Sequence, residues 1–324
     1  MSEETTHNPH DKLFKEAFSR PDMAVGFFQN YLPVEIVNRL DWETLHLESG
    51  KFTDEALRGS ESDLLFTVQI DQHPALLYCL FEHQSSPDPW MPLRLLRYIL
   101  GIWDQFRKQN PQSTKLPPVL PLVLYQGGDA WTTDTSLSSL IDIPEGLTAY
   151  QPALHHLLVD LNEISSDDLQ GTPSLRTILF TLKTSRKRKQ DEFALLVRLL
   201  ASILHIDSAL IRSVMLYLYS VDNETDITEY IKQAEALNQP ELQEAFMTIA
   251  DKLRKEGRQE GRQEGRQEAL QEDIVEILEL RFQSVSYSIK KQLEDISETT
   301  RLRRLHRLAV QVQSLDEFQK GIAG

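Results

Sequence analysis

The hydrophobic positions near the N-terminus follow a helical period. Phe14 and Phe18 lie four residues apart, and a second apolar stripe follows before Pro33. Residues four apart share one face of a helix, and proline commonly marks a helix end. The pattern therefore predicts a pair of helices within residues 9–40.

Beyond residue 62 the hydrophobic period changes to one typical of strands. Residues 63–70 are rich in strand-forming side chains, residues 71–74 have the composition of a turn, and residues 75–84 form a second strand-like run. Two such runs joined by a short turn predict a β-hairpin.

A helix and a third strand are predicted to follow this hairpin. Residues 91–108 place apolar side chains at helical spacing, and residues 119–125 form an apolar run after Pro117 and Pro118. A strand that is apolar on both faces requires cover on both. The order of helix, hairpin, helix and strand therefore predicts an α/β fold, in which helices flank a mixed β-sheet.

The C-terminal half of the chain is predicted to be helical. Strand signals thin from about residue 140, and residues 191–220 show the spacing of two packed helices. We accordingly divide the chain into a domain at residues 1–220 and a helical C-terminal region at residues 221–324.

The C-terminal region repeats the unit Gly-Arg-Gln-Glu three times within residues 255–268. Each glycine in a solvated helix costs about 1 kcal/mol relative to alanine, so an isolated helix here should be weak. A period of four aligns the glycines in a row that permits close approach of a second helix. We expect a helix at residues 250–283 that pairs with another helix and supports a homo-oligomer. A flexible charged linker is the alternative.

Charge and composition restrict the classes of function. The net charge of −15, from 34 Lys and Arg against 49 Asp and Glu, argues against a protein that coats nucleic acid. A nuclease needs only a local basic track beside its site. Candidate phosphate contacts are Lys12, Lys15, Arg94 and Arg97, although such residues more often belong to a solvated face.

The single cysteine and the N-terminal residues bear on the compartment. Cys79 lies in an apolar run, so we interpret it as core packing that fits a reducing compartment. The N-terminal residues lack the pattern of a signal peptide, and no apolar run reaches the length of a membrane span. We therefore expect a cytoplasmic protein.

Polar residues gather at one end of the predicted hairpin. Residues two apart on a strand face the same way, so Glu82 and Gln84 point together while His83 points to the other face. Asp63 begins the preceding strand, and an antiparallel hairpin brings it opposite that end. Two carboxylates are thereby expected within reach of one metal ion.

This arrangement suits phosphodiester chemistry. Two hard oxygen ligands leave coordination positions for water and a phosphate oxygen, so Mg²⁺ would polarise the phosphodiester and lower the pKa of the attacking water. The backbone carbonyl of His83 is a further candidate ligand. In the alternative interpretation, Asp63 merely begins a strand and Glu82 and Gln84 emerge into solvent. The His83 ring is more typical of a rim or core histidine than of a ligand.

These residues carry a resemblance to a known family. Asp63, followed nineteen residues later by Glu82-His83-Gln84, resembles the Asp…Glu-x-Gln form of the PD-(D/E)XK nuclease motif. More narrowly, the chain resembles the Rpn family of recombination-promoting nucleases, also labelled putative transposases. Supporting segments are residues 10–15, 91–98 and 121–127 and the glycine repeats. The match extends from about residue 9 to the end.

The resemblance implies a restriction-endonuclease-like core, DNA as the substrate, a role in DNA recombination and a divalent metal ion. The metal is usually Mg²⁺, with Mn²⁺ and Ca²⁺ as alternatives. Asp63 and Glu82 would be metal ligands, and Gln84 would take the place of the lysine in the commoner motif. Glutamine cannot act as a general base, so Gln84 would only orient the water or the phosphate, and slow cleavage is expected.

Two other classes of function stay open. An RNase-H-like transposase would need a third carboxylate, for which Asp104 and Asp129 are candidates without a context that demands them. A catalytically inactive DNA-binding or oligomerising module would keep Asp63 and Glu82 as relics. A cleavage assay across many metal ions separates the inactive module from the enzymes.

Overall fold

The computed structural model describes residues 8–48, 63–84, 86–185, 188–222, 224–296 and 298–323. The chain divides into two compact units, residues 1–247 and residues 248–324. The predicted boundary between a domain at residues 1–220 and a helical C-terminal region at residues 221–324 stays a prediction.

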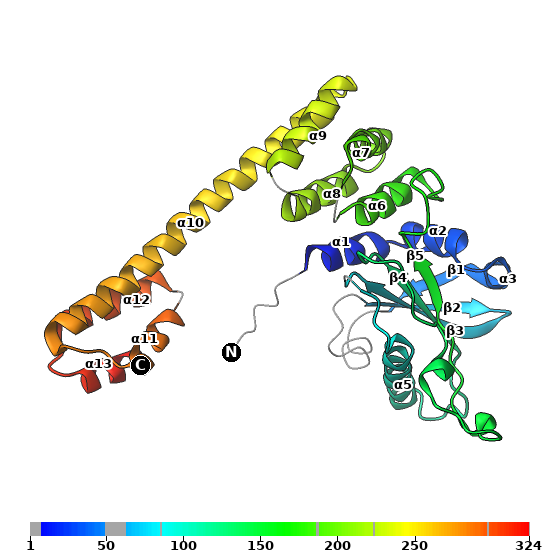
Figure 1. The fold of residues 1–324 in the computed structure, drawn as a ribbon, viewed down its shortest axis with the longest axis horizontal. Coiled ribbons are helices and arrows are strands. Elements are labelled where there is room, and N and C mark those ends of the chain that lie inside the picture. Colours follow the sequence, from blue (N-terminus) through cyan, green and yellow to red (C-terminus); the bar gives the residue numbers. More distant parts are fainter. Residues whose placement is uncertain are drawn as a thin grey trace. The chain divides into compact units, whose positions relative to one another are not determined.

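A five-stranded mixed sheet forms the centre of the N-terminal unit, with strand order β1-β2-β3-β4-β5 (Figure 1). The strands are β1 (Leu40–Leu47), β2 (Asp63–Ile70), β3 (His73–Glu82), β4 (Val119–Tyr125) and β5 (Leu157–Asp160). Strands β1, β2 and β3 are antiparallel in sequence order, whereas β4 and β5 run parallel to β3. The predicted α/β class with a mixed sheet is confirmed.

The β2–β3 hairpin turns through two residues. Asp71 and Gln72 have φ values of 49° and 65°, and a two-residue turn with positive φ at both positions matches the twist of antiparallel strands. The turn sets the register, which pairs Ile70 with His73 and continues to the pair Asp63–Leu80. This register fixes which residues lie opposite each other at the far end of the hairpin.

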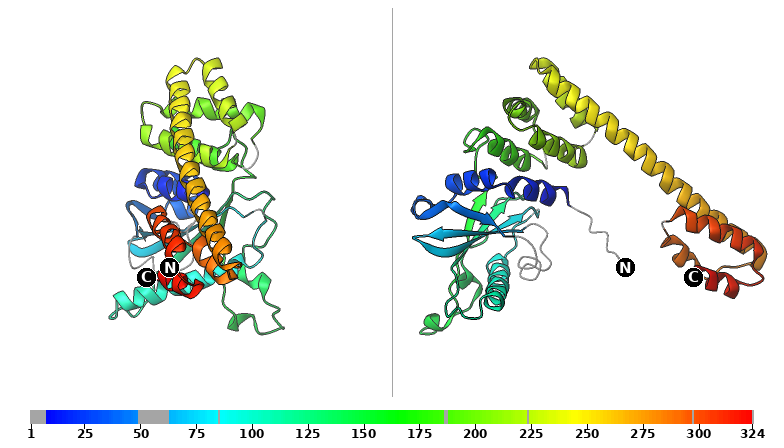
Figure 2. Two further views of the ribbon diagram at one scale, coloured as in Figure 1. Left: turned by 90° about the vertical axis from the view of Figure 1, so that its left-hand side faces the viewer. Right: turned by 180° about the vertical axis from the view of Figure 1, so that it is seen from behind.

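Helices cover the two faces of the sheet. Helices α1 (Pro9–Phe18) and α2 (Pro21–Tyr31) lie on one face and α5 (Met91–Gln109) lies on the other, which Figure 2 shows from behind. On the first face, Phe14 of α1 stacks on Phe81 of β3, with ring centroids 4.8 Å apart. The α5 face holds a second buried cluster. Its members include Leu65, Tyr78, Leu80, Met91, Leu95, Ile102, Val123 and Tyr125.

Further helices complete the N-terminal unit. They are α3 (Val34–Val37), α6 (Pro173–Lys183), α7 (Gln190–Ile203), α8 (Ser208–Val221) and α9 (Glu224–Ala236). Helix α6 contacts α2, and α8 contacts α1. The short 3₁₀ turns Leu137–Leu140 and Thr148–Tyr150 lie in the connection between β4 and β5. Within the described ranges, none of the helices combines the length and apolar content that a membrane span requires.

The C-terminal unit has a core of its own. Helix α10 (Pro240–Phe282) begins in the N-terminal unit and continues through this one, followed by α11 (Tyr287–Glu294), α12 (Thr299–Gln311) and α13 (Leu315–Ala323). Their apolar faces meet in one buried cluster. It includes Ile274, Leu278, Ile289, Leu293, Leu302, Leu305, Ala309 and Phe318. The helical character predicted for this region is therefore confirmed.

Most elements predicted from the hydrophobic pattern are present. The helices within residues 9–40, the hairpin, the helix after it, the apolar third strand and the helix over residues 250–283 are all confirmed. Cys79 is fully buried, as the packing interpretation requires, and burial raises the pKa of its thiol. The pattern missed β1 and β5. Pairing of the repeat with a second helix stays a prediction, because a Cβ at Gly265 would meet no atom within 4 Å.

Candidate functional site

The two candidate carboxylates lie at the same end and on the same face of the β2–β3 hairpin. Asp63 is the first residue of β2 and pairs with Leu80, while Glu82 is the last residue of β3. Cross-strand partners point to the same face, and so do residues two apart on one strand. Asp63 and Glu82 therefore both face α5. We call them the carboxylate pair.

Both members of the carboxylate pair are removed from water. Glu82 is 3% exposed and Asp63 is 7% exposed. A buried carboxylate is costly unless cations or hydrogen-bond donors compensate its charge. The alternative in which Glu82 emerges into solvent is therefore wrong, whereas Asp63 does begin a strand and Gln84 is exposed, as that alternative has them.

Each carboxylate has a protein donor beside it. The hydroxyl of Tyr78, on the same face of β3, donates to Oδ2 of Asp63. The Nη1 atom of Arg94 on α5 donates to Oε2 of Glu82 at 2.7 Å, and the backbone N–H of Gln84 donates to Oε1 of Glu82 at 3.1 Å. Strand β3 and helix α5 thus supply the compensation that burial demands.

Electrostatics keeps these donors in their protonated forms. Burial raises the pKa of Tyr78, and the charge of Asp63 raises it further, so the phenol stays neutral. Burial lowers the pKa of Arg94, but the Tyr98 hydroxyl and the charge of Glu82 outweigh this effect and raise it overall. Among the described contacts, the side chains beside the carboxylate pair therefore include a permanent cation, Arg94, and a neutral phenol, Tyr78.

Gln84 and His83 follow the end of strand β3. Gln84 is exposed and lies beyond the strand, so its side chain is not fixed by the sheet as the sequence suggested. Its catalytic role stays a prediction, as does metal binding by the backbone carbonyl of His83.

The ring of His83 points away from the carboxylate pair, as expected from the alternation along the strand. It hydrogen-bonds Asn8 at 2.6 Å, stacks on His10 with centroids 5.5 Å apart, and places Nδ1 3.4 Å from a carboxylate oxygen of Asp11. These residues belong to α1 and its N-cap. The ring is 25% exposed and packs on α1, as the sequence analysis expects for a rim or core histidine.

The other basic candidates are divided between the two faces of the sheet. Arg97 is exposed on α5, the helix that also carries Arg94. Lys12 and Lys15 lie on α1, which packs on the opposite face. Contact of any of them with DNA stays a prediction, and the α5 side is the one that adjoins the carboxylate pair.

The two carboxylates proposed for an RNase-H-like site differ in their surroundings. Asp104 is exposed on α5, where its carboxylate lies 3.7 Å from Arg107. Asp129 accepts a hydrogen bond at 2.9 Å from Ser86, which follows Gln84 by two residues. Neither is bonded to a member of the carboxylate pair in the contacts of the described residues.

The donor set fits a hard divalent cation. The residues that the structure describes contain no group of three or more His, Cys, Asp or Glu that could hold a metal ion. The carboxylate pair instead offers two oxygen donors, and Mg²⁺ commonly binds through one or two carboxylates while keeping several waters. The chemistry of the site therefore suits Mg²⁺ better than a metal that needs a complete protein cage.

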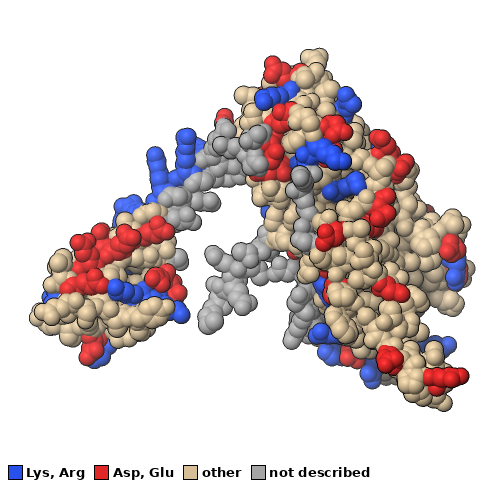
Figure 3. Space-filling view, viewed as in Figure 1, with Lys and Arg blue, Asp and Glu red and all other residues tan. Residues whose placement is uncertain are grey.

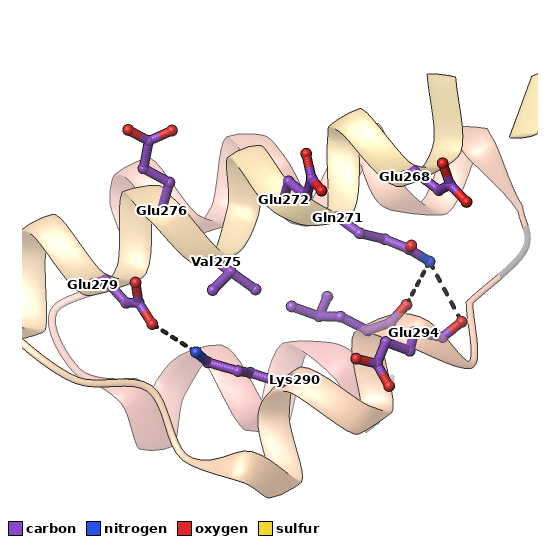
Figure 4. A pocket seen from close by; sticks show the side chains of 9 residues that line it. Glu268, Gln271, Glu272, Val275, Glu276, Glu279, Lys290 and Glu294 are labelled. Carbon is purple, nitrogen blue, oxygen red and sulfur yellow. Dashed lines mark hydrogen bonds and ion pairs between the residues drawn. The ribbon is translucent and has the colours of Figure 1, made fainter. Parts of the chain in front are cut away.

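The C-terminal unit presents a very different surface. A pocket between α10 and α11 is lined by carboxylates, with Lys290 paired to Glu279 at 2.7 Å (Figure 4). The acidic members are Glu268, Glu272, Glu276, Glu279 and Glu294. Acidic side chains also gather on the visible face of this unit in Figure 3. Such a surface repels phosphate, so we do not expect DNA to bind there.

The sequence analysis missed Tyr78, and it assigned Arg94 to DNA phosphate without anticipating its contact with Glu82. Tyr78 was hidden in an apolar strand, although its position two residues from Leu80 on the same face places it beside Asp63. The pairing of Arg94 with Glu82 depends on how α5 is rotated against the sheet, which no short motif encodes.

Comparisons with known proteins identify relatives of this chain. The family model described as "Putative transposase, YhgA-like" matches residues 8–211. The recombination-promoting nuclease RpnA of Escherichia coli (strain K12) is 30% identical over 79% of this chain and 87% of its own length. The recombination-promoting nuclease RpnD of Escherichia coli O157:H7 is 29% identical over 79% of this chain and 98% of its own length.

A further relative differs in its description. It is named an inactive recombination-promoting nuclease-like protein, RpnE of Escherichia coli (strain K12), and is 30% identical over 79% of this chain and 85% of its own length. No solved structure gives a significant match.

Proposed function

Because the chain belongs to the family of YhgA-like putative transposases, which includes relatives named recombination-promoting nucleases, we propose that it is a metal-dependent DNA endonuclease that promotes recombination. The observation that carries this proposal is the burial of Asp63 and Glu82 at the same end and on the same face of one hairpin. Buried carboxylates in this arrangement are suited to holding a cation.

The order of elements supports a PD-(D/E)XK core. Helices α1 and α2 precede three antiparallel strands, α5 follows them, and β4 then adds parallel to β3. In the proposed core, the motif residues belong to the second and third of these strands. Asp63 and Glu82 occupy those strands here.

The residues around the pair have distinct proposed roles. Asp63 and Glu82 would hold the metal ion, most simply Mg²⁺, which when bound supplies Lewis-acid polarisation of the phosphodiester and a lower pKa for the attacking water. Tyr78 orients Asp63 through its hydroxyl. Gln84 would orient the water or the scissile phosphate, because its amide cannot accept a proton as a base.

An inactive DNA-binding module is the second candidate, and the description of RpnE favours it. The two candidates differ in what a plasmid assay should show. We expect supercoiled DNA to be nicked in Mg²⁺ or Mn²⁺ and the reaction to stop when EDTA is added. Full-length protein that binds DNA but leaves it intact across Mg²⁺, Mn²⁺ and Ca²⁺ would instead support the inactive module.

A further inference from the structure

We propose that Arg94 is an internal cation that competes with the metal ion for Glu82 and leaves it for a phosphate when DNA binds, so that DNA and metal bind cooperatively. This inference rests on the proposed function. It adds a coupling between the two ligands that the carboxylate pair alone does not provide.

The contacts of Glu82 establish the competition. One oxygen accepts from Arg94 at 2.7 Å, and the other accepts from the backbone N–H of Gln84 at 3.1 Å. The backbone N–H is fixed by the chain, whereas the guanidinium is at the end of a long side chain. A metal ion that binds Glu82 therefore meets a full positive charge at close range, and repulsion between cations at such distances is strong inside a protein.

The surroundings of Arg94 give it a route to a second partner. Its side chain is 29% exposed, compared with 3% for Glu82, so the arginine reaches solvent while the carboxylate does not. Tyr98, one turn further along α5, accepts from Nε at 3.4 Å, and the guanidinium carbon lies 5.8 Å from the centre of that ring. These contacts hold the side chain at the edge of the site.

Phosphate is the partner that this chemistry favours. A guanidinium is a planar fork of donors that matches phosphate as well as carboxylate, and it stays charged when it moves between them. An arginine released from Glu82 toward a DNA phosphate would leave the carboxylate with room for a cation. The same movement would bring the positive charge of Arg94 against a phosphate of the DNA.

Thermodynamic linkage turns this exchange into a measurable coupling. If Arg94 lowers the affinity for metal when DNA is absent, and DNA removes Arg94 from Glu82, then DNA raises metal affinity and metal raises DNA affinity by the same factor. A protein without Arg94 should bind metal tightly from the start and show little further gain from DNA.

Metal affinity with and without DNA tests the proposal. Tb³⁺ binds hard oxygen ligands and is sensitised by nearby tyrosine, so Tb³⁺ luminescence with Ca²⁺ competition reports binding without cleavage. In Arg94→Met, we expect Ca²⁺ affinity without DNA to rise about tenfold and the gain caused by a short duplex to fall by a similar factor. Arg107→Met is the matched control, because Arg107 is an exposed arginine on the same helix that does not contact Glu82, and its metal affinity without DNA should equal that of the parent.

A second variant guards against misfolding of Arg94→Met. Arg94→Lys keeps the charge but not the planar fork, so we expect its affinity without DNA to stay near that of the parent and its DNA-induced gain to shrink. Unchanged or weaker metal binding in folded Arg94→Met overturns the proposal, and so does an unchanged gain in Arg94→Lys.

Glu82→Ala separates failure of this inference from failure of the proposed function. If Glu82→Ala loses metal binding while the Arg94 variants bind metal as the parent does, only the proposed coupling is overturned. If Glu82→Ala binds metal and cleaves DNA as the parent does, the proposed site itself is overturned.

Discussion

The hydroxyl of Tyr78 is a donor that helps to compensate the charge of Asp63 at the start of β2. Tyr78→Phe deletes this bond while keeping the ring, and hydrogen bonds to charged groups contribute about 1.5–3 kcal/mol. We expect the free energy of unfolding to fall by about 2 kcal/mol in urea titrations without metal. Saturating Ca²⁺ should recover part of the loss, because a bound cation replaces the missing donor.

A control for this prediction is Tyr31→Phe, which removes a tyrosine hydroxyl on α2 that bonds the backbone of Gln170, away from the carboxylate pair. If Ca²⁺ restored stability equally in Tyr78→Phe and in the control variant, the role assigned to Tyr78 would be contradicted.

His156 provides a test of pH dependence away from the carboxylate pair. Burial lowers its pKa from 6.5 to about 4, and its ring packs edge-on against Trp131. The unfolded chain therefore binds more protons between pH 6.5 and about 4, so this histidine makes stability fall as the pH is lowered through that window. Below about pH 4 its contribution is constant.

His156→Leu should flatten the loss of stability between pH 6.5 and 4. Urea titrations at several pH values measure the slope, and His155→Leu is the control because the neighbouring ring is exposed. Parallel pH profiles for His156→Leu and the parent would show that the buried imidazole does not set this dependence.

At the scale of elements, the two faces of the sheet have separate tasks. Helix α1 packs on the face opposite the carboxylate pair, where Phe14 is fully buried against Phe81. Phe14→Ala should lower the free energy of unfolding by about 3–5 kcal/mol through the cavity that it leaves. Leu100→Ala, at a half-exposed position of α5, should cost about 0.5 kcal/mol or less.

Metal affinity is the readout that separates the faces. Folded Phe14→Ala should bind Ca²⁺ as the parent does, because the substitution leaves the residues on the α5 face in place. If folded Phe14→Ala lost much of its affinity for Ca²⁺, α1 would have to position the carboxylate pair directly.

The elements also show which parts of the fold could be predicted from the sequence. The hairpin was predictable because its strands are apolar and its turn is polar, and that alone placed Asp63 near the end of β3. Strand β1 was missed because it is an edge strand with a single buried residue, Leu40, and is held by backbone pairing with β2. Strand β5 was missed because it has only four residues.

The candidate site was partly predictable for the same reasons. The alternation along β3 correctly separated Glu82 from His83, since it depends on backbone geometry alone. The ion pair of Arg94 with Glu82 was beyond prediction because it depends on the packing of α5 against the sheet. Exposed Gln84 has no packing that would have fixed its side chain in advance.

For the whole molecule, helix α10 carries the glycine repeat in the C-terminal unit, ahead of Ile274, which belongs to the buried cluster of that unit. Gly265 is exposed, and a Cβ there would meet no atom within 4 Å. Gly265→Ala should therefore stabilise the helix by about 1 kcal/mol, which thermal melts followed by circular dichroism would detect. At Gly321 a Cβ would collide with the Leu308 side chain, so Gly321→Ala should stabilise less.

We also propose that the C-terminal helical region supports a homo-oligomer through the glycine row. Sedimentation velocity over a range of concentrations tests this directly. A monomer at high concentration would contradict it. Loss of association in Gly265→Ala, despite a more stable helix, would place the glycine row in the interface.

The central claim is that the carboxylate pair holds the metal ion on which DNA cleavage depends. The initial rate of plasmid nicking by Glu82→Ala in Mg²⁺ tests this claim most directly. Glu43→Ala, which removes an exposed glutamate from strand β1, is the matched control. We predict no metal-dependent nicking by Glu82→Ala above the EDTA background, with DNA binding retained, and a parent-like rate for Glu43→Ala. Nicking by folded Glu82→Ala at the rate of the parent would contradict the account.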